Sequence, residues 1–141
     1  MKQILTLLTL AALPWLFLPG CDKDNIYQEV DCSLCFAAPP DSGFVHPEIT
    51  INASYTAVPV TVYEGPVESG KIVFSDTFSI PTPRIGLPTG KTYSLTATYV
   101  KDQDTIIVID GDKLEVKKAV GQCGGTCYVV TGGFYDLKLR E

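Results

Sequence analysis

The sequence predicts an all-β protein, with a single antiparallel β-sandwich of seven or eight strands following an N-terminal signal segment. Three observations lead to this fold class. From residue 48 onward, apolar and polar residues alternate with a period of two in one segment after another. Turn signals rich in Gly and Pro separate these segments at intervals of about eight to twelve residues. No window beyond the signal segment has the apolar period of an amphipathic helix, so we expect almost no helix.

The expected strands can be placed in order along the chain. Segment 49–55 (ITINASY) and segment 58–62 (VPVTV) each place their apolar residues on one face. The clearest strand is 91–99, where Tyr93, Leu95, Ala97 and Tyr99 share one face and hydroxyl side chains share the other. The remaining expected strands are 71–80, 105–109, 113–120, 127–131 and 134–139.

Segment 105–109 (TIIVI) is apolar on both faces, which predicts a central strand covered on both sides. Asp110-Gly111 follows it and is a strong hairpin signal, because glycine adopts a positive φ at little cost. Gly124-Gly125 and Gly132-Gly133 predict two further tight turns.

The N-terminus predicts a lipoprotein. Lys2 precedes an apolar run that is too short, and too interrupted by Pro14, to be a stable membrane span, so we interpret residues 1–20 as a cleaved signal peptide. The sequence Leu18-Pro19-Gly20-Cys21 resembles a bacterial lipobox, which implies that Cys21 is lipidated. We assign residues 21–47 to the lipid anchor and tether, and residues 48–141 to the β-sandwich domain.

Two further resemblances concern fold and location. Segment 60–80 followed by segment 85–100 resembles the immunoglobulin-like or transthyretin-like modules of bacterial secreted proteins, where a Leu-Pro-x-Gly turn introduces a strand containing tyrosine. The stretch after Cys21 (DKDNIYQEVD) resembles the Lys-plus-acid segment of surface-exported Bacteroidota lipoproteins, although a plain solvated tether explains it equally well. As a whole, the chain resembles small uncharacterised lipoproteins of the Bacteroidota. This resemblance implies an outer-membrane location, on the periplasmic or the cell-surface face, and no particular activity.

The net charge of the chain disfavours two classes of binding partner, nucleic acids and anionic lipids. The sequence has 11 Lys and Arg against 16 Asp and Glu, a formal charge of −5, and removing Lys2 with the signal peptide would make it −6. An acidic chain without a basic stripe is a poor ligand for nucleic acid. It is not drawn to anionic lipid either, so contact with the membrane has to come from the acyl chains on Cys21.

The sequence shows little sign of catalysis. Its one histidine, His46, stands beside Pro47 in the expected tether and is most simply a loop residue. No nucleophile elbow, phosphate-binding glycine loop or zinc-protease motif is present. The acidic pairs Asp102/Asp104 and Asp110/Asp112 are separated by an expected strand, so one calcium ion cannot use both. We therefore expect no enzyme activity, no cofactor and no metal.

Aromatic side chains offer one alternative function. Tyr63 and Tyr128 alternate against valines that are expected to be buried, and Phe134 alternates against Tyr135 and Leu137. These three aromatic residues are therefore candidates for stacking on a ligand such as a glycan.

Four cysteines remain after Cys21, as a Cys-x2-Cys pair (Cys32, Cys35) and a Cys-x3-Cys pair (Cys123, Cys127). A zinc site, a redox centre and structural disulfides are the three interpretations. A location outside the cytoplasm favours oxidised cysteines over zinc. A redox-active pair needs a cation or a helix N-terminus to lower its thiol pKa, whereas Glu29 and Asp31 precede Cys32. Structural disulfides are thus the favoured interpretation.

Sequence alone does not choose among the three connectivities of four cysteines. A three-residue hairpin loop would let Cys123 and Cys127 bond to each other, whereas a two-residue loop would point them to opposite faces. Bonding the two pairs to each other closes a loop of about 95 residues and stabilises by roughly 4.5 kcal/mol, against about 2 for a local ring. The energetics favours the long-range clamp, which would tie the base of the tether to the last hairpin.

These observations predict a non-catalytic, membrane-anchored envelope lipoprotein that acts as a protein-binding or assembly module. The alternative is a carbohydrate-binding module at the cell surface.

Overall fold

The computed structural model describes residues 31–121 and 123–140, so the expected signal peptide, Cys21 and the first part of the expected tether, residues 21–30, lie outside the described residues. The described chain is almost entirely β-structure, with one short 3-10 helix, η1 (Cys32–Leu34). Its eight strands are β1 (Ser42–Ile49), β2 (Val58–Glu64), β3 (Lys71–Phe78), β4 (Ile85–Pro88), β5 (Lys91–Lys101), β6 (Asp104–Val120), β7 (Thr126–Thr131) and β8 (Phe134–Leu137).

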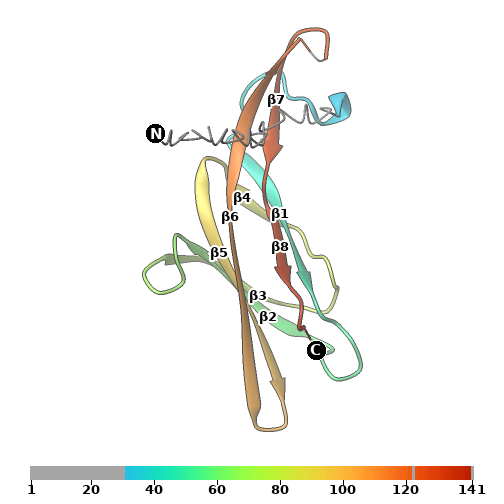
Figure 1. Ribbon diagram of the computed structural model, residues 1–141, viewed down its shortest axis with the longest axis vertical. Coiled ribbons are helices and arrows are strands. Elements are labelled where there is room, and N and C mark those ends of the chain that lie inside the picture. Colours follow the sequence, from blue (N-terminus) through green and yellow to red (C-terminus); the bar gives the residue numbers. More distant parts are fainter. Residues whose placement is uncertain (1–30, 122, 141) are drawn as a thin grey trace, which may run out of the picture.

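The strands form two sheets, which confirms the predicted sandwich (Figure 1). One sheet has the strand order β4-β1-β8, and the other has the order β3-β2-β5-β6-β7. All pairings are antiparallel except that of β1 with β8, which is parallel. The long strand β6 pairs with β5 along its first part and with β7 along its second part, so two hairpins share one continuous strand.

The core lies between the sheets and follows the predicted alternation. In β2, Val58, Val60 and Val62 are fully buried, and in β5 the predicted inward face is buried too. The buried apolar residues of the core are Val45, Ile49, Val58, Val60, Val62, Ile85, Leu87, Tyr93, Leu95, Ala97, Tyr99, Leu114, Tyr135 and Leu137. Their side chains are what the two sheets bury against each other.

Three buried tyrosines link the sheets through their hydroxyl groups. Tyr93 of β5 donates to the carbonyl of Pro88 at 2.8 Å, and Tyr99 of β5 donates to that of Leu137 at 2.7 Å. Tyr135 of β8 donates in the opposite direction, to the carbonyl of Asp112 at 3.3 Å. Burial raises the pKa of Tyr93 and Tyr135 above the ordinary tyrosine value, so both hydroxyls stay protonated donors.

Strand β1 begins at Ser42, inside the stretch that the sequence assigned to the tether, and His46 lies in this strand and not in a loop. Pro47 had suggested irregular structure, because proline removes a backbone donor from a ladder. Its position makes this harmless. The His46 N–H donates to the Gly133 carbonyl on the β8 side of β1. The backbone nitrogen of Pro47, the next residue, therefore points to the β4 side, beyond Val45 and Ile85, the last residues that β1 and β4 pair.

Two other sequence predictions are wrong. The expected strand 49–55 does not form, since β1 ends at Ile49 and a turn follows in which Asn52 accepts from Ser54 and Tyr55. The expected hairpin at Asp110-Gly111 is also absent, because β6 continues straight through both residues. The chain turns earlier, at Asp102, which adopts a φ of 55°.

Segment 105–109 is not a central strand. These residues pair with β5 on one side, whereas β7 pairs only with the later part of β6. Ile106, Ile107 and Ile109 are consequently about half exposed. A run that is apolar on both faces indicated two-sided burial, and the structure instead places it at a sheet edge.

The predicted turns at Gly124-Gly125 and Gly132-Gly133 both occur, with different roles. The first lies in the loop that joins β6 to β7. The second carries the chain from β7 in one sheet to β8 in the other, and both of its glycines have φ near +80°. A Cβ atom at Gly132 would lie 2.1 Å from the carbonyl oxygen of Lys113, so this crossing requires glycine.

A candidate ligand-binding cleft beside the disulfides

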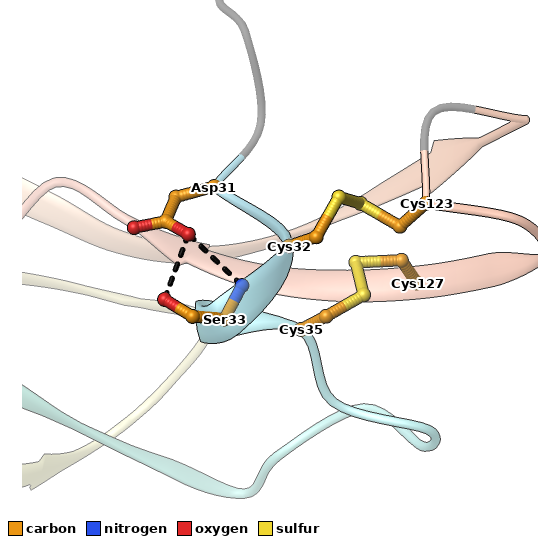
Figure 2. The surroundings of a disulfide bond; sticks show 6 residues. All are labelled: Asp31, Cys32, Ser33, Cys35, Cys123 and Cys127. Carbon is orange, nitrogen blue, oxygen red and sulfur yellow. Dashed lines mark hydrogen bonds between the residues drawn. A yellow bond between two sulfur atoms is a disulfide. The ribbon is translucent and has the colours of Figure 1, made fainter.

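The four cysteines pair over a long range, as the loop-closure energetics favoured. Cys32 bonds to Cys123 and Cys35 bonds to Cys127, across sequence separations of 91 and 92 residues. Figure 2 shows the two bonds side by side, joining η1 to the end of the β6–β7 hairpin. The predicted staple therefore connects the first described residues to the last hairpin.

This arrangement bears on the zinc and redox interpretations. The sulfur atoms of Cys35, Cys123 and Cys127 lie within 4.8 Å of one another, a spacing that three metal ligands could also have. The adjacent disulfides account for that spacing, because bonded sulfurs provide no thiolates for a metal or for nucleophilic attack. Cys127 is also buried.

Local hydrogen bonds hold η1 in place. Asp31 caps it, and one carboxylate oxygen accepts from the Ser33 backbone N–H at 2.9 Å and from the Ser33 hydroxyl at 2.7 Å (Figure 2). These bonds hold the pKa of Asp31 below its usual value. Phe36, two residues beyond η1, exchanges both backbone hydrogen bonds with Tyr128, which adds Phe36 to the edge of β7.

A cleft of about 670 Å³ lies between η1, the β6–β7 hairpin and the start of β8. This volume is in the range of small-molecule sites in proteins. The residues that line it are Asp31, Leu34, Asp112, Lys113, Glu115, Lys117, Val129, Val130, Thr131, Gly132 and Phe134. Leu34 and Phe134 are among the most exposed apolar side chains of the described chain, at 64% and 74%.

The charged residues of the cleft largely pair with each other or with the backbone. Lys113 forms an ion pair with Glu115, and this contact lowers the pKa of the Glu115 carboxyl. Asp112 accepts from the backbone N–H groups of Lys113 and Gly133, at 2.7 and 2.9 Å. The alternation of β6 places Lys113, Glu115 and Lys117 on the face away from the core.

Phe134 also lines a second hollow, of about 280 Å³, with Glu48, Asp110, Tyr135, Asp136 and Lys138. Lys138 pairs there with Glu48 and lies 3.8 Å from Asp136. Beside the hollows, the rings of His46 and Phe134 stack with centroids 5.7 Å apart and an angle of 21°. Phe134 therefore separates two hollows lined by polar groups and is supported by a second aromatic ring.

The three predicted stacking residues do not form one platform. Phe134 lines both hollows, but Tyr63 lies on β2, paired with Ser94, and Tyr128 lies on β7 beside Phe36. Neither tyrosine lines the cleft, and both are half-buried.

Sequence reasoning missed His46 and Leu34. His46 alternates with the buried residues Val45 and Pro47, and this signal was hidden by the proline. Leu34 lies between two cysteines and carries no periodic signal at all.

The acidic residues Asp110 and Asp112 have a structural use. Asp110 accepts from the backbone N–H of Asp136 at 2.8 Å, and Asp112 accepts from that of Gly133. Both bonds join β6 to the edge of the smaller sheet at β8. The two carboxylates thus accept from backbone N–H groups at that edge, which would otherwise lack a partner in the sheet.

No protein-family model, curated protein or solved structure matches the chain. Within residues 31–121 and 123–140, no helix is long and apolar enough to cross a membrane.

Proposed function

We propose that the chain is a lipid-anchored, non-catalytic envelope protein whose β-sandwich binds another envelope protein through the outer face of the five-stranded sheet. The anchor rests on the lipobox-like sequence before Cys21, and acylation there would hold the domain on the outer membrane. The binding role rests on one observation, the lack of charge on that outer face from the β5–β6 turn as far as Gly111; beyond Gly111, the same face of β6 carries Lys113, Glu115 and Lys117.

The register of β2, β3, β5 and β6 shows which residues share the outer face. As far as Gly111 they are Pro59, Thr61, Tyr63, Ile72, Ser75, Thr77, Ser94, Thr96, Thr98, Val100, Thr105, Ile107, Ile109 and Gly111. None of these side chains is ionisable near neutral pH, in a chain where 19% of residues are charged. A solvent-facing sheet surface normally carries charges of both signs, since they maintain solubility.

Large apolar side chains mark the same face. Ile72, Val100, Ile107 and Ile109 are each more than half exposed. Depletion of charge together with exposed apolar groups is what distinguishes the centre of a protein interface from ordinary surface. The edge of β6 at residues 104–110 adds backbone donors and acceptors beside this face. The chain also has a negative net charge, so an acidic partner meets the least repulsion at a neutral surface.

The non-catalytic part of the proposal is supported by how the reactive side chains are used. All four described cysteines are in disulfides. The one histidine of the chain stacks on Phe134. Covalent catalysis usually needs at least a nucleophile and a base that activates it, and these groups do not supply such a pair.

Site-specific photocrosslinking in whole cells tests the proposal. A photoreactive residue at Ile107 or Ile109 should yield a discrete crosslinked protein, which mass spectrometry identifies. Phe44 is the matched control position, because it is 53% exposed and lies on the other sheet. Ile107→Lys combined with Ile109→Lys should abolish the product, since it places two charges in the interface.

Two outcomes would contradict the binding face. One is that neither the Ile107 position nor the Ile109 position gives a discrete crosslinked product. The other is that the Phe44 position gives the same product in equal amount. Cys21→Ala tests the anchor separately, by moving the protein from the membrane fraction to the soluble fraction if Cys21 carries the lipid.

A further inference from the structure

We propose that Phe134 and the two hollows beside it form a binding site for a neutral oligosaccharide. One sugar ring would stack on the Phe134 ring, and neighbouring sugars would extend into the hollows on either side. This site lies on β8 and the β6–β7 hairpin, apart from the uncharged part of the outer face of the larger sheet, which ends at Gly111.

The first argument is the exposure and the support of Phe134. Its side chain is 74% exposed, although a phenylalanine gains most when it is buried. His46 stacks on it, which leaves a supported aromatic surface for a ligand. A sugar ring suits such a surface, because one of its faces presents C–H groups that pack against an aromatic ring.

The second argument is the rigidity of the backbone under this ring. Gly133, the preceding residue, accepts from His46 N–H at 2.7 Å and donates to the Asp112 carboxylate at 2.9 Å. A Cβ at Gly133 would lie 3.0 Å from Leu114 and from the Phe44 carbonyl, so the chain is tightly packed at this point. The platform is therefore held in position before a ligand arrives, which reduces the entropy cost of binding.

The third argument is the chemistry of the two hollows. Each contains an acid–lysine pair, Lys113 with Glu115 in the cleft and Lys138 with Glu48 in the smaller hollow. In both pairs the lysine contacts one carboxylate oxygen, and a carboxylate and an ammonium group each offer several hydrogen-bonding sites. Sugar hydroxyls both donate and accept, so they can bond to both members of such a pair.

The same pairing explains why the ligand should be neutral. A charged ligand would compete with an ion pair that already exists in each hollow. A hydroxyl group can add to the pair without breaking it. The wall formed by Leu34 and Val129 gives the cleft an apolar side against which a sugar face can pack.

Isothermal titration of the full chain tests the proposal. The protein is held in a polyoxyethylene detergent, which has no sugar headgroup, and is titrated with cellohexaose, maltohexaose and chitohexaose. We expect saturable one-to-one binding of at least one hexasaccharide. Phe134→Ala should weaken that binding by about tenfold, the loss expected for one aromatic stacking contact.

Phe44→Ala is the matched control. Phe44 is an exposed phenylalanine on the same sheet, covered by the Arg84 guanidinium at 4.2 Å, and lines neither hollow. This variant should bind within about twofold of the wild type. His46→Ala should fall between the two, because it removes the support behind the platform and not the platform itself. Since Phe134 and Phe44 are both exposed, the variants should keep the wild-type thermal midpoint, which calorimetry checks.

The proposal is overturned if none of the three sugars saturates the protein by about 10 mM, where even a very weak site would fill. It is equally overturned if Phe134→Ala binds as the wild type does. Binding of hexalysine that depends on Phe134 in the absence of sugar binding would assign the site to a basic peptide instead.

Discussion

The β6–β7 hairpin and the β5–β6 hairpin project from opposite ends of the sandwich, and each becomes a two-stranded ribbon where the rest of its sheet stops (Figure 1). Beyond Leu114, the last residue that β6 pairs with β5, the upper ribbon consists of β6 and β7. At the other end, residues 98–101 of β5 and 104–107 of β6 pair only with each other, because β2 pairs with β5 no farther than Ala97. An isolated two-stranded ribbon is marginally stable in water, so each of them needs an anchor.

The two anchors differ in chemistry. Two disulfides and the Phe36 bridge fasten the upper ribbon to the N-terminal segment. The lower ribbon is held at its base by the Tyr99 hydroxyl, which donates to Leu137 and accepts from the Thr50 backbone N–H at 2.9 Å. The upper ribbon extends away from the core, whereas the lower one starts where the core ends. Covalent bonds thus fasten the ribbon that extends away from the core, and one buried hydroxyl fastens the ribbon that starts at the core.

The largest expected effect is the loss of both disulfides. The chain-entropy model gives roughly 4.5 kcal/mol for the first bond, which closes a loop of about 91 residues, and roughly 2.5 for the second. The second is smaller because, once the first bond exists, it closes a ring of only a few residues on each side. Replacing all four cysteines by alanine should therefore lower the free energy of unfolding by about 7 kcal/mol, enough to unfold a typical domain.

Removing either bond alone gives the matched control. Cys32→Ala with Cys123→Ala, or Cys35→Ala with Cys127→Ala, should each cost about 2.5 kcal/mol in urea denaturation, because the remaining bond still closes the long loop. A loss from either single removal as large as that from the fourfold variant would contradict the nested arrangement. The intact mass without reductant should also fall by about four hydrogens relative to the reduced chain, as two disulfides require.

The next largest effect concerns the two glycine turns around β7. Gly132→Ala should lower the free energy of unfolding by roughly 3 kcal/mol, since the new Cβ meets the Lys113 carbonyl in a backbone conformation that alanine disfavours. Gly124→Ala is the control, because Gly124 also has a positive φ but no atom within 4 Å of the added Cβ. It should cost only about 1 kcal/mol. Equal losses in thermal denaturation would show that the crossing between sheets is not the tight point.

The sequence predicted the fold wherever side-chain alternation decided burial. The valines of β2 and the inward face of β5 are buried as predicted, because half-buried strands have to alternate. The same reasoning failed at segment 105–109. Its apolar residues on both faces look like those of a central strand, and only the position where β7 ends reveals that they lie at an edge.

The candidate site was predictable only in part. Phe134 follows from its alternation with buried neighbours, and the cysteines follow from their number and setting. The cleft itself depends on the disulfides bringing Leu34 to the β6–β7 hairpin, a contact between residues about a hundred positions apart. Neither periodicity nor composition determines such a contact, since it arises from the connectivity that the sequence leaves open.

The smallest expected effect tests the anchor of the lower ribbon. Tyr99→Phe removes the hydroxyl that serves Leu137 and Thr50, and should lower the free energy of unfolding by about 1–2 kcal/mol. Hydrogen exchange should rise at residues 100–106, because the ribbon loses its link to the smaller sheet while its own ladder remains. Exchange at residues 116–120 should stay as in the wild type, since the disulfides hold that ribbon. Tyr63→Phe, on the outer face, is the control and should change neither. If Tyr99→Phe instead raised exchange equally in both ribbons, the two hairpins would share one anchor, and the covalent and the hydrogen-bonded supports would not act separately.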